Sequence, residues 1–252
     1  MENIVVRYLE KPTLNDPIFI EGLPGIGNVG KLAAEHLKDE LKAVKFAEIY
    51  SKYFPPQVLV LEDGQIRLVS NEMHYVKRPG LQDFVILTGD YQGLTPEGQY
   101  ELTDRIMQEI VALGVRQAFT LGGYGLGHMV TNPRVLGAAT DPQLVKEMEK
   151  LGVVFSRSEP GAGIVGASGL VLGLGKLYGV RSVCLMGETS GYFVDPKSAQ
   201  AVLQALTKIL GIEVSYAELE TKAKQIDQIT SKLREVEAQP DTPTKEDLGY
   251  IA

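Results

Sequence analysis

The sequence contains only one cysteine, three histidines and no tryptophan, and this scarcity limits the chemistry available to the chain. The lone Cys184 excludes both an internal disulfide and a cysteine-rich metal site, and its apolar surroundings predict a packed core thiol. His36, His74 and His128 lack the spacing of metal ligands, such as H-E-x-x-H, so we expect surface or capping roles for them. We therefore expect a protein without a metal or another cofactor.

A basic charge excess and a long apolar run are also missing. The formal net charge of −7 opposes a general nucleic-acid role, which requires a basic surface. No apolar run reaches the roughly 18 residues needed to span a bilayer, and Met1-Glu2-Asn3 does not begin a basic leader. We expect a cytoplasmic protein that binds proteins or small molecules, and neither nucleic acid nor membrane.

What the chain does contain is an alternation of short apolar runs and amphipathic segments. Several runs lack polar alternation, which is typical of strands covered on both faces. The strands are expected at residues 4–6, 18–20, 44–49, 84–87, 117–121 and 183–186. The helices are expected at residues 27–40, 96–113, 142–151 and 196–210. This order predicts an α/β fold, with a mostly parallel sheet between helices in a three-layer, phosphorylase-like or Rossmann-like arrangement.

The expected helices have clear boundary signals. Thr95, Asp141 and Asp195 each precede a proline, which predicts an N-cap followed by proline at the first helical position. A glycine follows the last turn of three of the helices, at positions 114, 152 and 211. Asp63-Gly64 separates two short apolar runs and predicts a hairpin, which we expect to add an antiparallel element to the sheet.

The segment Gly22–Lys31 fits two nucleotide-binding motifs at once. Gly25, Gly27 and Gly30 give G-x-G-x-x-G between a strand-like and a helix-like run. The same segment resembles a phosphate loop, but a leucine at position 32 replaces the hydroxyl that would ligate magnesium, which argues against nucleotide hydrolysis. Glu48 lies at a suitable distance for a ribose contact. The competing interpretation is a tight turn in which glycine permits positive φ and close packing.

Two further glycine clusters follow strand-like runs, Gly122–His128 with Gly122 and Gly123, and Gly161–Gly166 with Gly161 and Gly163. If the sheet is parallel, these loops gather at its carboxyl edge and form a shared ligand cleft. The apolar stretch 164–179 predicts either a close-packed helix or a buried loop. The loops lack a convincing catalytic motif. The sequence around Ser168 differs from the G-x-S-x-G motif of serine hydrolases by one position. The carboxylates that remain as candidates are Glu188, Asp90 and Asp195.

The end of the sequence has a different character. Leu219, Ala223, Ile226, Thr230 and Leu233 follow a heptad spacing, which predicts a helix that either packs on the domain or meets another subunit. From position 238 the pattern is lost, and the chain reads as a flexible acidic linker with an apolar and aromatic end. We therefore expect a core at residues 1–212, an amphipathic helix at 213–237 and a flexible tail at 238–252.

Four segments together resemble the archaeal branch of the type 2 proteasome assembly chaperone family: Gly22–Gly30, the Gly122-Gly123 turn, Gly187–Pro196 and Asp247–Ile251. The resemblance runs from Ile18 to the tail. It implies a phosphorylase-like fold without known catalysis, a role in assembly of the proteasome core particle, and homo-oligomers such as the rings of some archaeal members. It also implies that the tail docks between α-subunits of the proteasome ring.

The tail departs from the family's hydrophobic-tyrosine-X pattern, because Tyr250 is third from the end and not second. An aromatic side chain with a polar tip and apolar neighbours is nevertheless suited to a peptide anchor. The expected partner-binding residues are Leu248, Tyr250, Ile251 and Ala252.

Three hypotheses follow from these patterns. The leading one is a non-enzymatic protein that self-associates and binds proteasome α-subunits through its tail. The second is a nucleoside- or nucleotide-binding enzyme or sensor that uses the loops at Gly25, Gly122 and Gly161. The third is an oligomeric scaffold whose tail only ties subunits together.

Overall fold

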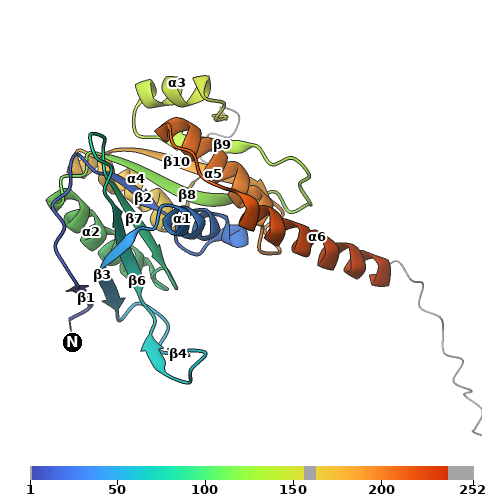
Figure 1. The fold of residues 1–252 in the computed structure, drawn as a ribbon, viewed down its shortest axis with the longest axis horizontal. Helices are drawn as coiled ribbons and strands as arrows, with labels where there is room; N and C mark the ends of the chain where they lie inside the picture. The colour runs from blue at the N-terminus through green and yellow to red at the C-terminus, as the bar shows by residue number, and fades with distance from the viewer. Residues whose placement is uncertain (1, 156–162, 238–252) are drawn as a thin grey trace, which may run out of the picture.

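The computed structural model describes residues 2–155 and 163–237. Gly161 and the four expected partner-binding residues of the tail lie outside the described residues. Figure 1 shows a sheet at the centre of the molecule, with helices on both of its faces. The α/β class and the three-layer arrangement predicted from the sequence are confirmed.

The central sheet has eight strands in the order β1-β3-β6-β7-β2-β8-β10-β9. The pairs β7-β2, β2-β8 and β8-β10 are parallel, whereas the outer strands join in antiparallel register. The bounds are β1 Ile4–Tyr8, β2 Ile18–Glu21, β3 Val44–Ser51, β6 Asn71–Val76, β7 Phe84–Gly89, β8 Gln117–Gly125, β9 Val135–Ala139 and β10 Arg181–Thr189.

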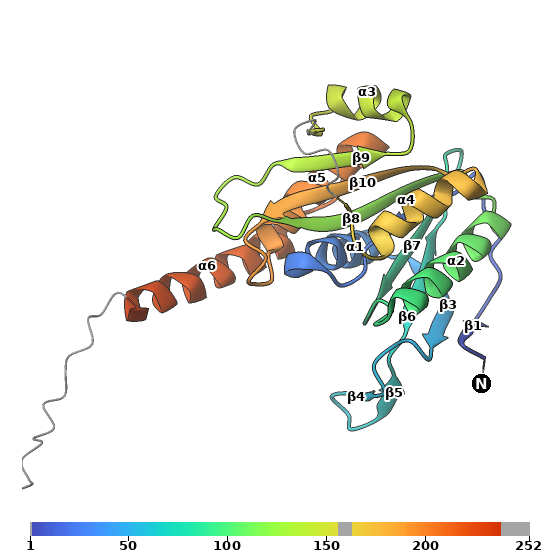
Figure 2. The same cartoon turned by 180° about the vertical axis from the view of Figure 1, so that it is seen from behind.

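Each face of the sheet has its own hydrophobic core. Helices α2 and α4 cover one face, as Figure 2 shows, and α1 and α5 cover the other. β2 and β7 contribute to both cores: Phe19 and Val85 face one, and Ile20 and Ile86 face the other. The helical bounds are α1 Val29–Glu40, α2 Pro96–Ala112, α3 Pro142–Lys150, α4 Ala167–Tyr178 and α5 Pro196–Leu210, with a short 3₁₀ turn at Ile26–Asn28 before α1.

The predicted helix boundaries are confirmed because their signals are local. The side chains of Thr95, Asp141 and Asp195 accept hydrogen bonds from the first turns of α2, α3 and α5. Gly211 ends α5 in the left-handed conformation, with φ at 63°. The prediction for Cys184 is confirmed as well, since the thiol is fully buried in β10 and burial raises its pKa to about 12.

The expected hairpin forms, but its predicted place in the main sheet is wrong. Strands β4 Val58–Val60 and β5 Ile66–Leu68 pair with each other as a separate two-stranded sheet. Figures 1 and 2 show this hairpin projecting from the body of the molecule. Of its apolar side chains, Leu59 packs against the core under α2 and α4, whereas those of Val58, Val60, Ile66 and Leu68 face solvent.

The structure also changes the predicted loop at Gly122-Gly123 and adds strands to the predicted sheet. Gly122 and Gly123 belong to β8 and do not form a loop after it, because the strand continues to Gly125 along β10. Strands β6 and β9 were not predicted. Of the two alternatives for residues 164–179, the structure has the helix, which forms α4.

Helix α6, Ala217–Glu237, begins against the core and then runs away from it (Figures 1 and 2). Leu219 is fully buried in the core that α1 and α5 share. Before the helix, the Ser215 carbonyl contacts His36 Nε2 at 2.6 Å, and the Ser215 amide donates to Glu40 at 2.9 Å. The start of the helix is therefore fixed to the domain, and a contact of its remainder with another subunit stays a prediction.

Candidate protein-binding surface

Three loops meet at the carboxyl edge of the parallel strands, and they comprise residues 22–28, 126–134 and 190–195. The amide of Asp195 donates a hydrogen bond to the Gly27 carbonyl at 2.9 Å. The amide of Leu126 donates to the Thr189 carbonyl at 2.8 Å. The backbone of one loop therefore holds the backbone of the next, so that the edge forms a continuous surface.

Three glycines of the predicted motifs are explained by close packing. A Cβ atom at Gly30 would lie 2.0 Å from the carbonyl oxygen of Leu121, and a Cβ at Gly123 would lie 2.3 Å from that of Ile26. Gly27 has a φ of 60°, in the left-handed region that side chains disfavour. The contacts fit the interpretation of the first motif as a tight turn with close backbone approach.

The remaining glycines of the predicted ligand loops occupy different environments. Gly25 has an extended backbone, and a Cβ atom at this position would lie 3.9 Å from the Gln92 side chain, which is an ordinary contact. Gly122 lies within β8, and Gly163 is exposed with no neighbour within 4 Å of a built Cβ. Gly161 lies outside the described residues. A ligand role for these glycines stays a prediction.

The position of Glu48 is inconsistent with the dinucleotide interpretation. In that fold the strand after the first helix lies beside the first strand, so its acidic residue reaches the ribose. Here β3, which carries Glu48, is separated from β2 by β6 and β7. The Glu48 carboxylate instead accepts hydrogen bonds from Lys45 at 2.9 Å and Tyr50 at 2.9 Å. The expected ribose contact is therefore wrong.

Glu188, a candidate ligand residue from the sequence, is held by an arginine from the loop after β8. Its buried carboxylate accepts hydrogen bonds from the Arg134 guanidinium and from the Arg134 amide, the latter at 3.1 Å. These bonds hold the pKa of Glu188 below its usual range. The pair fixes the loop before β9 against β10, so the Glu188 carboxylate has a structural role.

A buried carboxylic acid at the end of β2 was missed by the sequence analysis. Glu21 is fully buried and accepts hydrogen bonds from Ser168 Oγ at 2.9 Å and from the Leu23 amide at 3.0 Å. Burial raises its pKa to about 7, although both hydrogen bonds act in the opposite direction. The only signal in the sequence is an acidic residue between an apolar run and Gly22, which is too common to single out.

Gln92 joins the same two regions from a third segment of the chain. Its Nε2 donates to the Pro24 carbonyl at 2.7 Å, and its Oε1 accepts from the Ala167 amide at 2.9 Å. The glutamine therefore connects the first glycine loop to the N-terminus of α4. Both partners of Gln92 are backbone groups, whereas the neighbouring Glu21 and Ser168 side chains hydrogen-bond to each other.

Replacing Glu21 by glutamine is expected to remove part of the pH dependence of stability. The folded-state pKa of Glu21, about 7, lies above the ordinary glutamate pKa of 4.5, so the folded state holds the proton more tightly than the unfolded state. The stabilisation that Glu21 gains from this proton is fully present below pH 4.5 and is lost as the pH rises through 7. The stability difference between wild type and Glu21→Gln should change by roughly 3 kcal/mol over this range.

Urea denaturation of both proteins at pH 4.5 and pH 8 measures this change. The wild type should gain relative to Glu21→Gln at the lower pH, because only the glutamate binds an extra proton on folding. Glutamine is a suitable replacement since it can accept from the Leu23 amide and donate to Ser168. Parallel pH profiles for the two proteins would show that Glu21 does not titrate in this way.

Exposed apolar side chains gather where the carboxyl-edge loops meet α6. We call this surface the α6 platform, and it consists of Ile26, Met129, Tyr192, Phe193 and Val194. Tyr192 is 71% exposed and donates its hydroxyl hydrogen to the Gly127 carbonyl at 3.3 Å. Exposed apolar residues that cluster in this way mark interaction sites more often than scattered ones do.

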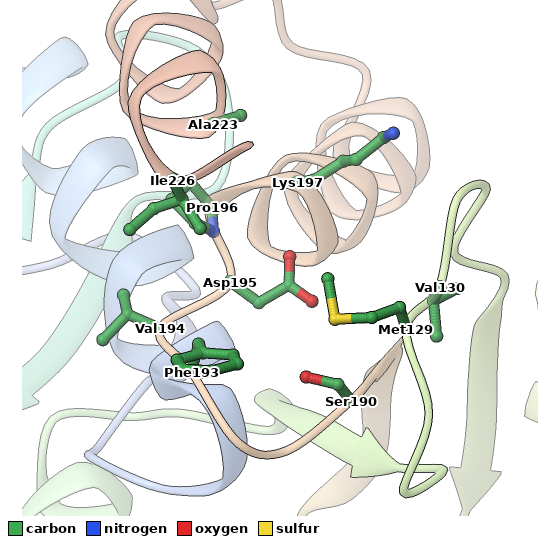
Figure 3. Close-up of a pocket in the computed structure, with 10 residues that line it drawn as sticks. All are labelled: Met129, Val130, Ser190, Phe193, Val194, Asp195, Pro196, Lys197, Ala223 and Ile226. Atoms are coloured by element: carbon green, nitrogen blue, oxygen red, sulfur yellow. The ribbon is translucent and has the colours of Figure 1, made fainter. Parts of the chain in front are cut away.

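A small cavity lies between the platform and the helix (Figure 3). Its volume is about 40 Å³, far below the several hundred Å³ of typical small-molecule pockets. Asp195 lines it, but its carboxylate already accepts hydrogen bonds from the Ser198 amide and hydroxyl at 2.9 Å each. Figure 3 shows the Lys197 ammonium directed away from Asp195. The space suits a side chain or a water molecule better than a metabolite.

The chemistry of this edge favours recognition of another polypeptide. Across residues 2–155 and 163–237, no group of three or more His, Cys, Asp or Glu side chains is arranged to hold a metal ion. The helices in that part of the chain also include none that is long and apolar enough to cross a membrane. Near the platform, the Asp195 carboxylate caps α5 and the Glu188 carboxylate pairs with Arg134, whereas the apolar side chains of the platform are exposed among the described residues.

Comparison with known proteins places these features in a family. The sequence model of the PAC2 family matches residues 19–234. The chain belongs to the PAC2 family. The resemblance to proteasome assembly chaperones noted from the sequence is thereby confirmed at the level of the family. The match begins within β2, so it leaves out β1 but spans the other strands of the sheet, the α6 platform and most of α6 in this PAC2 protein.

Two archaeal structures and one archaeal sequence are similar to this PAC2 protein over most of its length. PbaB of Pyrococcus furiosus, described as an archaeal proteasome activator, shares 43% identity and a TM-score of 0.89 over 93% of this chain and 100% of its own. PbaA of the same organism, described as an archaeal homolog of proteasome-assembly chaperone, shares 29% identity and a TM-score of 0.77 over 93% and 92%. Protein MJ1210 of Methanocaldococcus jannaschii is 41% identical over 100% of this chain and 98% of its own.

Proposed function

We propose that this PAC2 protein is a non-enzymatic binding protein that self-associates and engages the α-subunits of the proteasome core particle, partly through its C-terminal tail. The observation that carries the proposal is the similarity to PbaB, because it extends along the whole of a protein described as a proteasome activator. The similarity to PbaA, described as a homolog of proteasome-assembly chaperone, supports the same class of partner.

The arrangement of the surface supports binding of a large partner. Helix α6 extends from the domain and carries the chain toward residues 238–252 (Figure 1). The α6 platform lies at the base of that helix, since Met129 and Phe193 line a cavity together with Ile226. A partner that contacted both this platform and the tail would make two linked contacts, which strengthen each other.

The alternative function, a nucleoside- or nucleotide-binding enzyme or sensor, receives less support from the geometry. Gly27, Gly30 and Gly123 are explained by packing, and Glu21 is buried away from solvent. A thermal-shift measurement with nucleosides, nucleotides and phosphate separates the hypotheses, because a ligand at a hundred times its Kd stabilises by about 2.7 kcal/mol. A shift of that size would favour the alternative.

Co-migration of the full-length protein with purified archaeal α-subunits tests the proposal directly. The two proteins are mixed, separated by size-exclusion chromatography and weighed by native mass spectrometry. We expect a complex that contains both chains. The absence of a complex at micromolar concentration would contradict the proposal, whatever the oligomeric state of the free protein.

The substitution Tyr192→Glu is expected to weaken binding of the α-subunits about tenfold. Its side chain is largely exposed on the α6 platform, so the change places a charge on apolar surface without opening the core. Leu177→Glu is the matched control, because Leu177 is 82% exposed on α4, away from this surface. Biolayer interferometry measures both affinities. Equal losses in the two variants would show that the platform has no special role.

A further inference from the structure

The projecting hairpin carries an apolar face that residues 2–155 and 163–237 leave uncovered. Val58 pairs with Leu68 and Val60 pairs with Ile66, so all four side chains lie on one face of the two-stranded sheet. Each of the four is exposed, and Val60 and Ile66 are 72% and 66% exposed. Two-stranded sheets are marginal in water without cover for such a face.

The same face continues into a groove at the base of the hairpin. Val58 and Leu68 line the groove together with Tyr50, Phe54, Pro55 and Pro56, and its volume is about 610 Å³. Its residues are mostly apolar, and Lys52 supplies the positive charge among them. The groove has room for several aliphatic side chains of a partner.

The tip of the hairpin has the opposite charge. Glu62 and Asp63 are exposed at the turn, between the two apolar strands. The hairpin thus has an apolar body and an acidic tip, whereas the groove has an apolar lining and a lysine. In an arrangement with two-fold symmetry, the base of one hairpin lies opposite the tip of the other, and every contact occurs twice.

We propose that the hairpin and groove form an isologous interface with a second copy of this chain. Val60 and Ile66 of each copy pack on the partner's hairpin face and groove, and Glu62 and Asp63 of each copy approach Lys52 of the other. A second copy is favoured because the chain itself supplies both the apolar body and the complementary charges. The inference rests on the self-association in the proposed function, and it names the surface responsible.

This interface would leave the other contacts of the protein free. Figures 1 and 2 show the hairpin and α6 leaving the body in different directions. Two copies joined at their hairpins therefore present two α6 platforms and two tails. A partner with repeated subunits could be engaged at two points, which raises the effective affinity without a new contact.

The first test uses the full-length double variant V60K/I66K. Both side chains are highly exposed, so the lysines place charge on the interface without disturbing the core. We expect the Kd of self-association to rise at least thirtyfold, measured by sedimentation equilibrium, with unchanged circular dichroism and thermal midpoint. L177K, on α4, is the matched control and should retain the wild-type mass.

The second test exchanges charges between copies. K52E alone, and E62K/D63K alone, should each self-associate more weakly than the wild type. An equimolar mixture should form mixed dimers. In K52E both the groove and the tip are acidic, and in E62K/D63K both are basic, so each groove in a mixed dimer faces a tip of opposite charge. Native mass spectrometry identifies the mixed species, provided that one variant carries a heavy-isotope label.

The inference is overturned if V60K/I66K keeps the wild-type mass, if the wild type is monomeric at tens of micromolar, or if the charge variants fail to form mixed dimers. A variant that keeps its mass but no longer binds α-subunits would assign the hairpin to the proteasome and not to a second copy. Binding of α-subunits is measured separately with immobilised partner, so failure of this interface is distinguishable from failure of the proposed function.

Discussion

Replacing Gly30 by alanine is expected to lower the free energy of unfolding by at least 3 kcal/mol. The added Cβ would lie 2.0 Å from the carbonyl oxygen and 2.6 Å from the carbonyl carbon of Leu121. Both are backbone atoms of β8, so no side-chain rotation can relieve the contact, and α1 must move away from the sheet. A change of this size lowers the Tm of a chain of this length by roughly 6–12 °C.

Gly25→Ala is the matched control in the same motif. Gly25 has an extended φ of −162°, and a built Cβ would approach Gln92 no closer than 3.9 Å. We expect this variant to unfold within about 0.5 kcal/mol of the wild type. Urea denaturation measures both. Similar small effects at the two positions would contradict the close-packing account and reopen the interpretation of the motif as a ligand loop.

The parts of the fold that depend on neighbours in sequence were predictable. Thr95 followed by Pro96, and Leu210 followed by Gly211, place helix ends correctly because a cap acts within one turn. The uninterrupted apolar run at residues 84–87 placed β7 for a related reason, since a strand buried on both faces needs apolar residues at each position.

The order of the strands was not predictable from those local signals. The distance in sequence from Gly30 to Glu48 fits a ribose contact only if β3 lies beside β2, and two other strands separate them. The Asp63-Gly64 turn specified the hairpin but not its place, because turn chemistry carries no information on which sheet the strands join. Both errors concern contacts between distant segments.

The candidate site was only partly predictable for the same reason. Glu21, Gln92 and Ser168 are separated by about 70 residues or more along the chain, and the fold alone brings them together. The α6 platform likewise combines residues from three loops, and exposure of an apolar side chain is invisible in a sequence. Glu188 was identified as a candidate, but its partner Arg134 was not.

Removal of residues 248–252 is expected to weaken binding of proteasome α-subunits at least a hundredfold. The tail holds Tyr250 between Leu248 and Ile251, and a tyrosine that fills a partner's pocket is among the side chains that most often carry the affinity of an interface. A hundredfold loss corresponds to roughly 3 kcal/mol. The thermal midpoint of the truncated protein should equal that of the wild type, because the five residues lie beyond α6.

The substitution Tyr250→Ala should reproduce most of this loss. The double variant Thr242→Ala/Thr244→Ala is the control, since it changes the preceding linker without removing an apolar anchor. If the scaffold hypothesis is right, truncation will instead change the native mass of the free protein and leave capture of α-subunits intact. The two hypotheses therefore predict opposite results for mass and for binding.

The most direct test of the account is the affinity of the full-length and truncated proteins for the same immobilised α-subunits. We expect saturable binding of the full-length chain at micromolar concentration or below, and a Kd at least a hundred times higher for the protein that lacks residues 248–252. Equal affinities of the two proteins, or no binding by either, would contradict the claim that this PAC2 protein acts by binding the proteasome through its tail.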